Sequence, residues 1–569
     1  IHDDLPPNYY RQLPKLAEGP FAGYPRVFGL AWGFIAHTDS HFDPETLTRF
    51  IAAYQQVQPL TIGELWAVAI TLRIVLVENM RRLADQITAG RKDRAEADAL
   101  ADLLLTGDSV DTVIGRMPDK PLPELFAAQL AKRLRDHDPR TTPAHGWLEA
   151  RLANQKNSIE NVVQHAQQRQ GASNVTVRNI ITSMRLISDI DWADLFERVS
   201  LVDAALNQNG HFPAMEFATR DLYRSAIEHL ARGSELSELE IARAAVEAAE
   251  TAGGVDASAI EAERLSDPGC YLVAQGRPAF ERTIKFRQPV RLHLARLMGR
   301  MGIAGYGAAI AAATLALVGI LLWPVWGMSP AAGLLYPLLA LALLPASEAA
   351  TAIINRAVSC GAGASSLPGL ELAGGVPEQF RTLVVVPTLL VSRVELIEDI
   401  ERLEVHFLSG TGGDISFALL TDGLDADAET LEGDGELLAL GLETIAELNR
   451  RHGPGPAGDR FMLLNRKRRF NAGEGVWMGW ERKRGKLSEL NHLLRGATDT
   501  SFATPDGQVP TVPANVRYFI TLDSDTRLPR DAALRLVGKM AHPLNRPRLG
   551  IEDRRVVDGY AIIQPRVNQ

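Results

Sequence analysis

Cysteine is scarce in this chain, and its scarcity argues against several classes of protein. The 569 residues include two cysteines, Cys270 and Cys360, which lie far apart and match neither a metal-site nor a redox spacing. A secreted domain built on disulfides is therefore disfavoured, and the pattern fits a reducing cytosol better.

An excess of charge of one sign is also lacking. The formal net charge is -9, and acidic and basic residues are mixed along the chain, so there is no broad basic surface and a nucleic-acid partner is not expected. The length exceeds what one hydrophobic core organises and predicts about three regions. The chain starts at Ile1 without Met and stops at Gln569 inside an α/β pattern, so we interpret it as an excerpt.

The first region, residues 1–290, is predicted to be a helical cytosolic domain. Thr61 and Glu64 form a capping box that should open a helix over residues 62–88, and a second helix is expected over residues 93–105. Further helical patterns centre on Ile159, Phe196, Tyr223 and Leu239, with turn signals at residues 43–45, 118–123, 138–139 and 267–269.

Two histidines and two aspartates lie within seven residues of this region, between His37 and Asp43. A metal site is one interpretation. However, Asp43 directly precedes Pro44 and a helical pattern, and Asp at the N-cap with Pro at the first helical position is a common way to begin a helix. We therefore predict a loop and a cap, with a metal site as the alternative.

The next region, residues 300–357, is predicted to be a transmembrane helical hairpin. Residues 303–326 carry no charge and are long enough to cross a bilayer, and a second apolar run over residues 331–347 meets Glu348 before resuming to Ile354. Basic residues precede the first run, whereas the connecting turn, residues 327–330, carries no charge, so both flanks should be cytosolic. A buried hairpin in a soluble protein is the alternative, and Glu348 should lie near the interface or against protein.

The last region, residues 376–569, is predicted to be the beginning of an α/β domain. Strands are expected over residues 382–388, 415–420 and 518–522, with a helix over residues 393–404. Strands that alternate with helices predict a largely parallel sheet, whose ligands gather at the carboxyl ends of the strands. Pro387-Thr388, Asp422 and Asp523-Ser524-Asp525 all fall at such ends.

These polar residues suit sugar transfer from a nucleoside diphosphate. Asp523 and Asp525 can hold Mg²⁺ or Mn²⁺, which prefer oxygen ligands and neutralise a diphosphate leaving group. Asp422 can bind the nucleoside, and Lys486, at the start of a helix, can face phosphate. For Asp523 and Asp525 a surface turn or a cap is the alternative, and for Asp422 it is a surface carboxylate; the basic stretch 466–469 either lines the site or is solvated.

The order of the motifs carries a resemblance. Val-Pro-Thr, Thr-Asp-Gly, Gly-Lys-x-x-x-Leu-Asn and Leu-Asp-Ser-Asp-Thr together resemble the cytosolic GT-A domain of processive, inverting glycosyltransferases related to cellulose synthase. Longer strings, which extend over essentially the whole chain, resemble the cyclic β-1,2-glucan synthases of bacterial envelopes: PKLAEGPFAGYPRVFGLAWGFIAHTDSHFDPE, VVVPTLLVSR, GWERKRGKLSELN, ITLDSDTRLPR and MAHPLNRP.

This resemblance implies an inverting, metal-dependent enzyme of the bacterial inner membrane, with several spans and with its helical and glycosyltransferase domains cytosolic. It would take UDP-glucose and a glucan acceptor, either free or protein-linked, and make a β-1,2-glucan that is later cyclised into an osmoregulated periplasmic glucan. It assigns the uracil pocket to Pro387 and Thr388, the uridine to Asp422, the diphosphate to Lys486, further donor contact to Asn491, the donor to Asp523 and the metal to Asp525 with Asp523.

The sequence also departs from the related synthases. Leu389-Leu390 stand where an Asn-Glu pair is usual, so contacts from that loop are in question. The general base and the Gln-x-x-Arg-Trp motif of the acceptor channel are expected beyond residue 569, and so is the phosphorylase-like region. Two other functions stay open: a linear β-glucan synthase of the cellulose-synthase type, and a catalytically inactive, membrane-anchored scaffold that binds nucleotide sugars.

Overall fold

The computed structural model describes two compact units, residues 1–204 and 205–569. Within them it describes residues 9–105, 110–115, 117, 120–135, 142–208, 211–252, 259–326, 332–362, 366–410, 412–550 and 555–565. The division between the units falls inside the predicted helical region 1–290. The expected turn at residues 138–139 lies outside the described residues, as does part of the one at residues 118–123.

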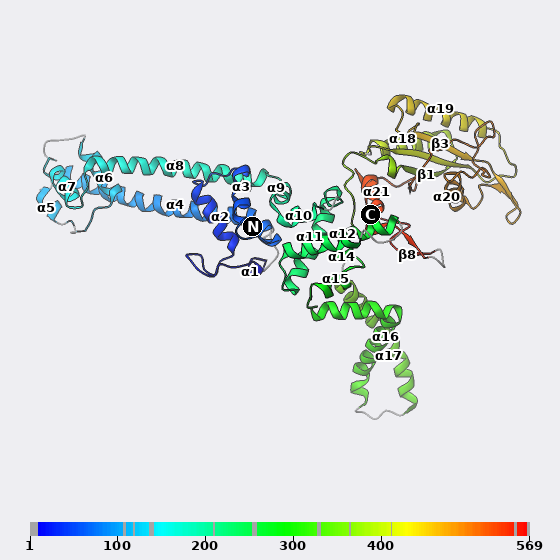
Figure 1. The fold of residues 1–569 in the computed structure, drawn as a ribbon, viewed down its shortest axis with the longest axis horizontal. Coiled ribbons are helices and arrows are strands. Elements are labelled where there is room, and N and C mark those ends of the chain that lie inside the picture. Colours follow the sequence, from blue (N-terminus) through cyan, green and yellow to red (C-terminus); the bar gives the residue numbers. More distant parts are fainter. Residues whose placement is uncertain are drawn as a thin grey trace. The chain divides into compact units, whose positions relative to one another are not determined.

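The first unit is helical, as predicted (Figure 1). Its helices are α1 (Tyr9–Gln12), α2 (Arg26–His37), α3 (Pro44–Gln55), α4 (Ile62–Leu105), α5 (Val110–Gly115), α6 (Glu124–Arg135), α7 (Thr142–Asn154), α8 (Ile159–Asp189) and α9 (Trp192–Val199), with α10 (Leu201–Leu206) at its end. The long helices α4 and α8 run side by side and pack with α6.

Helix α4 corrects one expectation. It is continuous over 44 residues, whereas two separate helices were predicted over residues 62–88 and 93–105. The intervening residues contain Gly90 and no proline, and Leu125 of α6 packs where a side chain on Gly90 would lie, so tertiary packing offsets the poor helix propensity of glycine. The predicted capping box is confirmed, because Thr61 N donates to Glu64 and Glu64 N donates to Thr61 Oγ1.

The cluster between His37 and Asp43 begins a helix. Asp43 is the N-cap of α3 and accepts a hydrogen bond from Thr46 N at 2.8 Å, with Pro44 in the first turn. Among the described residues no three His, Cys, Asp or Glu side chains gather into a group that could hold a metal ion. The capping interpretation is confirmed.

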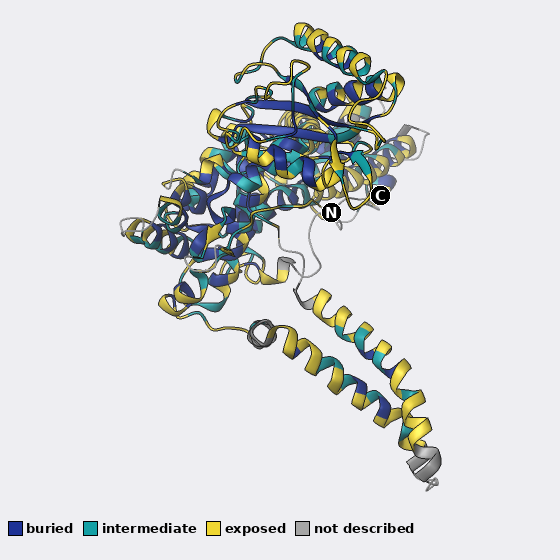
Figure 2. Ribbon diagram, turned by 90° about the vertical axis from the view of Figure 1, so that its right-hand side faces the viewer, coloured by how far each residue is buried: buried dark blue, intermediate teal, exposed yellow. Residues whose placement is uncertain are grey.

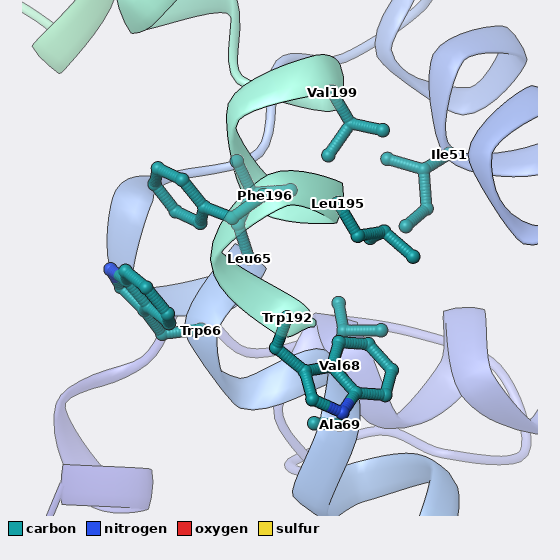
Figure 3. A pocket seen from close by; sticks show the side chains of 9 residues that line it. All are labelled: Ile51, Leu65, Trp66, Val68, Ala69, Trp192, Leu195, Phe196 and Val199. Atoms are coloured by element: carbon teal, nitrogen blue, oxygen red, sulfur yellow. The ribbon is translucent and has the colours of Figure 1, made fainter. Parts of the chain in front are cut away.

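An apolar pocket lies between α3, α4 and α9 of this unit (Figure 3). Trp66 stacks on Phe196 beside it, with ring centroids 4.4 Å apart. The lining is aliphatic and aromatic, and it consists of Ile51, Leu65, Trp66, Val68, Ala69, Trp192, Leu195, Phe196 and Val199. This pocket is part of the core that joins the three helices and offers no charged group for chemistry.

The second unit begins with helices and continues into a helical hairpin. The helices are α11 (Phe217–Gly233), α12 (Glu238–Ala252), α13 (Ala259–Leu265), α14 (Gly269–Leu272) and α15 (Arg277–Thr283), with the short η2 (Phe212–Ala214) before them. The hairpin consists of α16 (Val290–Trp326) and α17 (Ala332–Ala362), which pack against each other. Its predicted turn, residues 327–330, lies outside the described residues.

Both hairpin helices are long and apolar enough to cross a membrane. The candidate spans are Gly302–Pro324 and Tyr336–Cys360, and most of their side chains are exposed (Figure 2). Gly302, with φ of 53°, interrupts α16 where the first span begins. Glu348 lies within the second span with an exposed side chain, and Tyr306 donates to Asn355 Oδ1 at 2.5 Å between the two helices. These spans fit a membrane protein.

The α/β domain is built on a four-stranded parallel sheet in the order β3-β2-β1-β6, which confirms the predicted class. Its strands are β1 (Thr382–Leu390), β2 (Ile415–Gly423), β3 (Phe461–Arg466) and β6 (Tyr518–Thr521), and its helices are α18 (Arg393–Leu408), α19 (Asp434–His452), α20 (Arg482–Leu493) and α21 (Ala532–Ala541). Strand β2 is almost entirely buried and β1 is buried over residues 382–386, as parallel strands covered on both faces should be (Figure 2).

Short elements complete this domain. Two small antiparallel ribbons are separate from the main sheet, β4 (Arg469–Asn471) with β5 (Val476–Met478) and β7 (Arg548–Leu549) with β8 (Val556–Asp558). Two 3-10 turns, η3 (Glu378–Phe380) and η4 (Pro543–Asn545), precede β1 and follow α21. In the main sheet β3 and β6 are the two edge strands, and the carboxyl ends of all four parallel strands lie on the same side of the sheet.

A strap of residues 366–371 connects the helices of the second unit with the α/β domain. Glu216 N donates to Gly369 O at 3.0 Å, and Leu370 N donates to Gly538 O of α21 at 3.1 Å. Lys539 of α21 also donates to Glu216 at 2.7 Å. The helices before the hairpin and the sheet domain after it therefore share one hydrogen-bonded seam.

Candidate functional site

A cavity of about 500 Å³ opens at the carboxyl edge of the sheet. In the parallel register Thr388 pairs with Thr421 and Leu389 with Asp422, which sets the ends of β1 and β2 side by side. The lining combines these strand ends with the start of α20: Pro387, Thr388, Leu389, Asp422, Gly423, Leu424, Asp425, Gly479, Arg482, Lys483 and Lys486. Four of the predicted site residues, Pro387, Thr388, Asp422 and Lys486, are thus brought together.

Asp422 is a buried carboxylate in an ion-pair network. The alternative interpretation, in which Asp422 is a surface carboxylate, is therefore wrong. Its side chain is 4% exposed, and Arg466 at the end of β3 donates to both of its oxygens, at 2.6 and 2.8 Å. Lys486 Nζ lies 3.0 Å from Asp422 Oδ2. Arg466 also lies 3.4 Å from Glu489, so two cations and two carboxylates balance one another beside the cavity.

Lys486 is more deeply placed than the sequence predicted. It is in the second turn of α20 and is 2% exposed, and its Nζ donates to Thr388 O at 2.6 Å and Leu420 O at 3.1 Å. Burial lowers the pKa of this lysine, and the Asp422 carboxylate opposes that shift. Lys486 therefore ties β1 and β2 together at the cavity, and the three donors of its ammonium are directed at protein oxygens.

The cations that face the cavity most openly were not assigned from the sequence. Arg482 and Lys483 are exposed at the start of α20, where Arg482 pairs with Asp425 at 2.8 Å and Lys483 pairs with Asp523. The signal that marks them is the run of four basic residues between positions 482 and 486, of which only Lys486 was chosen. Arg466 was also left open, between lining the site and being solvated, and it is buried.

Asp523 and Asp525 follow the last residue of β6 and are both exposed. Thr526 N donates to Asp523 O at 3.0 Å and Arg402 donates to Ser524 O at 3.3 Å, which holds the loop at the sheet edge. Two carboxylates from one strand end suit Mg²⁺ or Mn²⁺, because such ions commonly bind one or two carboxylates and complete their shell with water and substrate phosphates. The residues present therefore fit the metal expected from the sequence.

Some positions stand apart from the predicted arrangement, since neither Asp523 nor Asp525 lines the cavity and Asp523 reaches it only through its ion pair with Lys483. Asn491 is exposed on α20 and does not line the cavity. Leu389, near the end of β1 where the sequence departs from related synthases, does line it and is 48% exposed. The apolar side chain of Leu389 therefore forms part of the cavity wall at the position where related synthases usually have a polar residue.

The comparisons with known proteins bear on the whole chain. No family model matches it. Cyclic beta-(1,2)-glucan synthase NdvB of Rhizobium meliloti (strain 1021) is 40% identical over 575 residues, which cover all of this chain. The chain is homologous to a cyclic β-1,2-glucan synthase. The resemblance predicted from the motifs is thus confirmed, and the chain spans 20% of the length of that relative.

Proposed function

We propose that the chain contributes the donor site of a membrane glycosyltransferase that transfers glucose from UDP-glucose to a growing β-1,2-glucan, with inversion, on the cytosolic side. The observation that carries the proposal is the cavity at the carboxyl edge of the parallel sheet, which Asp422 and a basic turn line and where Lys483 of that turn pairs with Asp523. Homology to a glucan synthase along all described elements supports the choice of sugar transfer.

In this proposal the nucleoside lies against the ends of β1 and β2. Pro387 and Thr388 supply the wall of the uracil pocket, and the Asp422 carboxylate, held in place by Arg466 and Lys486, accepts hydrogen bonds from the uridine. A preformed acceptor suits this role because its orientation costs nothing at the moment of binding.

The diphosphate lies between the basic turn and the aspartate loop. Arg482 and Lys483 are the exposed cations nearest that space, and each would exchange its present carboxylate partner for phosphate oxygens. Lys486 contacts the same group if its Nζ gives up one of its carbonyl acceptors. Asp523 and Asp525 would hold Mg²⁺ or Mn²⁺, which supplies charge neutralisation to the leaving diphosphate.

The deciding experiment is incorporation of labelled glucose from UDP-glucose by membranes that contain the full-length parent protein of this chain. Asp525→Asn should abolish incorporation that depends on Mg²⁺ or Mn²⁺, whereas Asp506→Asn, an exposed aspartate elsewhere in the domain, should leave it unchanged. Equal incorporation by wild type and Asp525→Asn would remove Asp525 from the metal site. Linkage analysis of the product then separates a β-1,2-glucan from a linear β-glucan of another linkage.

An inactive nucleotide-sugar-binding scaffold makes a different prediction. It would bind UDP without dependence on Mg²⁺ or Mn²⁺ and would incorporate no glucose. The exposed pair of carboxylates beside the cationic turn supports the enzyme over the scaffold, because a scaffold has no need for a metal at the leaving group.

A further inference from the structure

Arg466 is fully buried beneath the cavity at the end of β3. Its side chain is 0% exposed, and its guanidinium donates from Nε to Asp422 Oδ1 at 2.6 Å and from Nη2 to Asp422 Oδ2 at 2.8 Å. This two-pronged contact is the geometry in which arginine binds a carboxylate most specifically. Asp422 alone, however, does not use all five N–H groups of the guanidinium.

The other donors of Arg466 reach a different segment, the basic turn, residues 479–485. Nη1 donates to Trp480 O at 3.1 Å, and Nη2 donates to Arg482 O at 3.0 Å. Nη1 also lies 3.4 Å from Glu489 of α20. One planar group thus links the strand end that carries the site to the segment that carries its exposed cations.

The basic turn needs such an anchor. Glu481 and Arg482 have φ of 51° and 47°, a left-handed conformation that costs residues with side chains about 1 kcal/mol or more each. Gly479 packs so closely against the network that an added Cβ would lie 2.7 Å from Asp422 Cγ and 2.9 Å from Arg466 Nη2. The backbone is therefore held in a costly conformation by contacts with Arg466 and Asp422.

We propose that Arg466 is a positioning residue that fixes the basic turn, and with it Arg482 and Lys483, over the diphosphate of the sugar nucleotide. The inference rests on the proposed function, because it assigns the turn to diphosphate binding. Arg466 itself has no exposed surface and contacts no substrate. Its effect passes through the two carbonyls that it binds.

Lysine cannot replace arginine in this position. A lysine at 466 would keep a positive charge opposite Asp422, but its ammonium is a single point and lacks the planar fork that reaches Asp422 and two carbonyls together. Arg466→Lys therefore tests positioning apart from charge.

The chain offers a matched control at the opposite edge of the same sheet. Arg381, just before β1, pairs through Nε with Asp414 at 2.9 Å, donates to Ala514 O at 2.6 Å and has a side chain that is 10% exposed. It is a buried arginine with a carboxylate and a carbonyl partner, and it does not line the cavity. Arg381→Lys should lower the melting temperature as Arg466→Lys does.

The experiment measures two quantities on the purified, detergent-solubilised protein. The first is the affinity for UDP in the presence of Mn²⁺ by titration calorimetry, and the second is amide hydrogen exchange of residues 479–485 without nucleotide. Arg466→Lys should weaken UDP binding about tenfold and speed exchange in the turn. Arg381→Lys should leave both as in wild type. Wild-type affinity in Arg466→Lys, or equal losses in both variants, would overturn the proposal.

A second variant covers the case in which Arg466→Lys does not fold. Gly479→Ala should push the turn from Asp422 and Arg466 and weaken UDP binding in the same way, and an unchanged affinity would refute the proposal. Failure of the wild type to bind UDP with Mn²⁺ would refute the proposed function itself. Binding by the wild type with no difference among the variants would refute the role of Arg466 alone.

Discussion

At the scale of single residues, the site depends on buried charges that satisfy one another. Asp422, Arg466 and Lys486 are each less than 5% exposed, and removing any one of them would leave an uncompensated charge in the interior. The exposed groups Lys483, Asp523 and Asp525 are different, because solvent screens them and the pair of Lys483 with Asp523 exchanges readily. The buried set supports the shape of the cavity, and the exposed set is free to respond to ligand.

A buried histidine gives a pH-dependent prediction at this scale. His542 follows α21 and is 0% exposed, and burial, assisted by His211, Lys539 and Arg546, lowers its pKa to about 3. Its ordinary pKa is near 6.5, so the unfolded chain binds the proton between pH 6.5 and 3 and the folded chain does not. The contribution of neutral His542 to the free energy of unfolding is therefore fully present above pH 6.5. It is lost progressively as the pH falls from 6.5 towards 3.

The expected loss from His542 between pH 7.5 and 5.5 is about 1.4 kcal/mol of unfolding free energy. Chemical denaturation of wild type and His542→Gln at both pH values measures this loss. The unfolding free energy of the variant should fall by about 1.4 kcal/mol less than that of wild type between the two pH values. Asp267 lies close by, and burial raises its pKa; it is present in both proteins, so the difference isolates His542. Equal losses in the two proteins would contradict the prediction.

At the scale of elements, close backbone contacts decide where helices dock. Helix α21 approaches the strap 366–371 at Gly538, where an added Cβ would lie 2.3 Å from Leu370 O. The same strap binds Glu216 through Gly369 and so connects α21 with the region before α11. A side chain at position 538 would have to push the strap away.

Gly538→Ala should therefore destabilise the protein by about 1–3 kcal/mol and speed hydrogen exchange in residues 366–371. The matched control is Gly435→Ala in α19, where nothing lies within 4 Å of the added methyl group. This control should be neutral or slightly stabilising, because alanine is the better helix former. Thermal unfolding together with exchange mass spectrometry checks both, and a neutral Gly538→Ala would show that the strap yields at little cost.

At the scale of the whole molecule, the apolar hairpin fits a membrane protein. The candidate spans Gly302–Pro324 and Tyr336–Cys360 expose their apolar side chains, which is unfavourable in water and suits lipid. Basic residues lie before the first span, so the helices that precede it and the α/β domain that follows the second should share the cytosolic side.

The protein should therefore remain in the membrane pellet after extraction with alkaline carbonate. Replacing residues 302–360 by a flexible polar linker should release it into the supernatant, because the apolar side chains of the two spans, of 23 and 25 residues, supply the partition energy. A peripheral membrane protein in the same extract serves as the control, because alkaline carbonate should release it into the supernatant. Release of the unaltered protein by carbonate would contradict the membrane assignment.

The sequence by itself determined the classes of structure and the resemblance. Periodicity and turn residues predicted the helical region, the hairpin and the parallel sheet, because hydrophobic spacing is a local property of the chain. The motif order predicted the homology with cyclic β-1,2-glucan synthases, and strand ends placed Pro387, Thr388, Asp422, Asp523 and Asp525 at one edge of the sheet.

Only the tertiary structure decided how those residues are used. Arg466 and Lys486 both lie in basic stretches of the sequence. No local pattern predicts that these two side chains are buried around Asp422 while Lys483 faces solvent. Burial depends on which segments pack together across 44 to 98 positions of sequence, as the contacts from Arg466 to Asp422 and from Lys486 to Thr388 do. The continuity of α4 was decided in the same way, by Leu125 of another helix packing against Gly90.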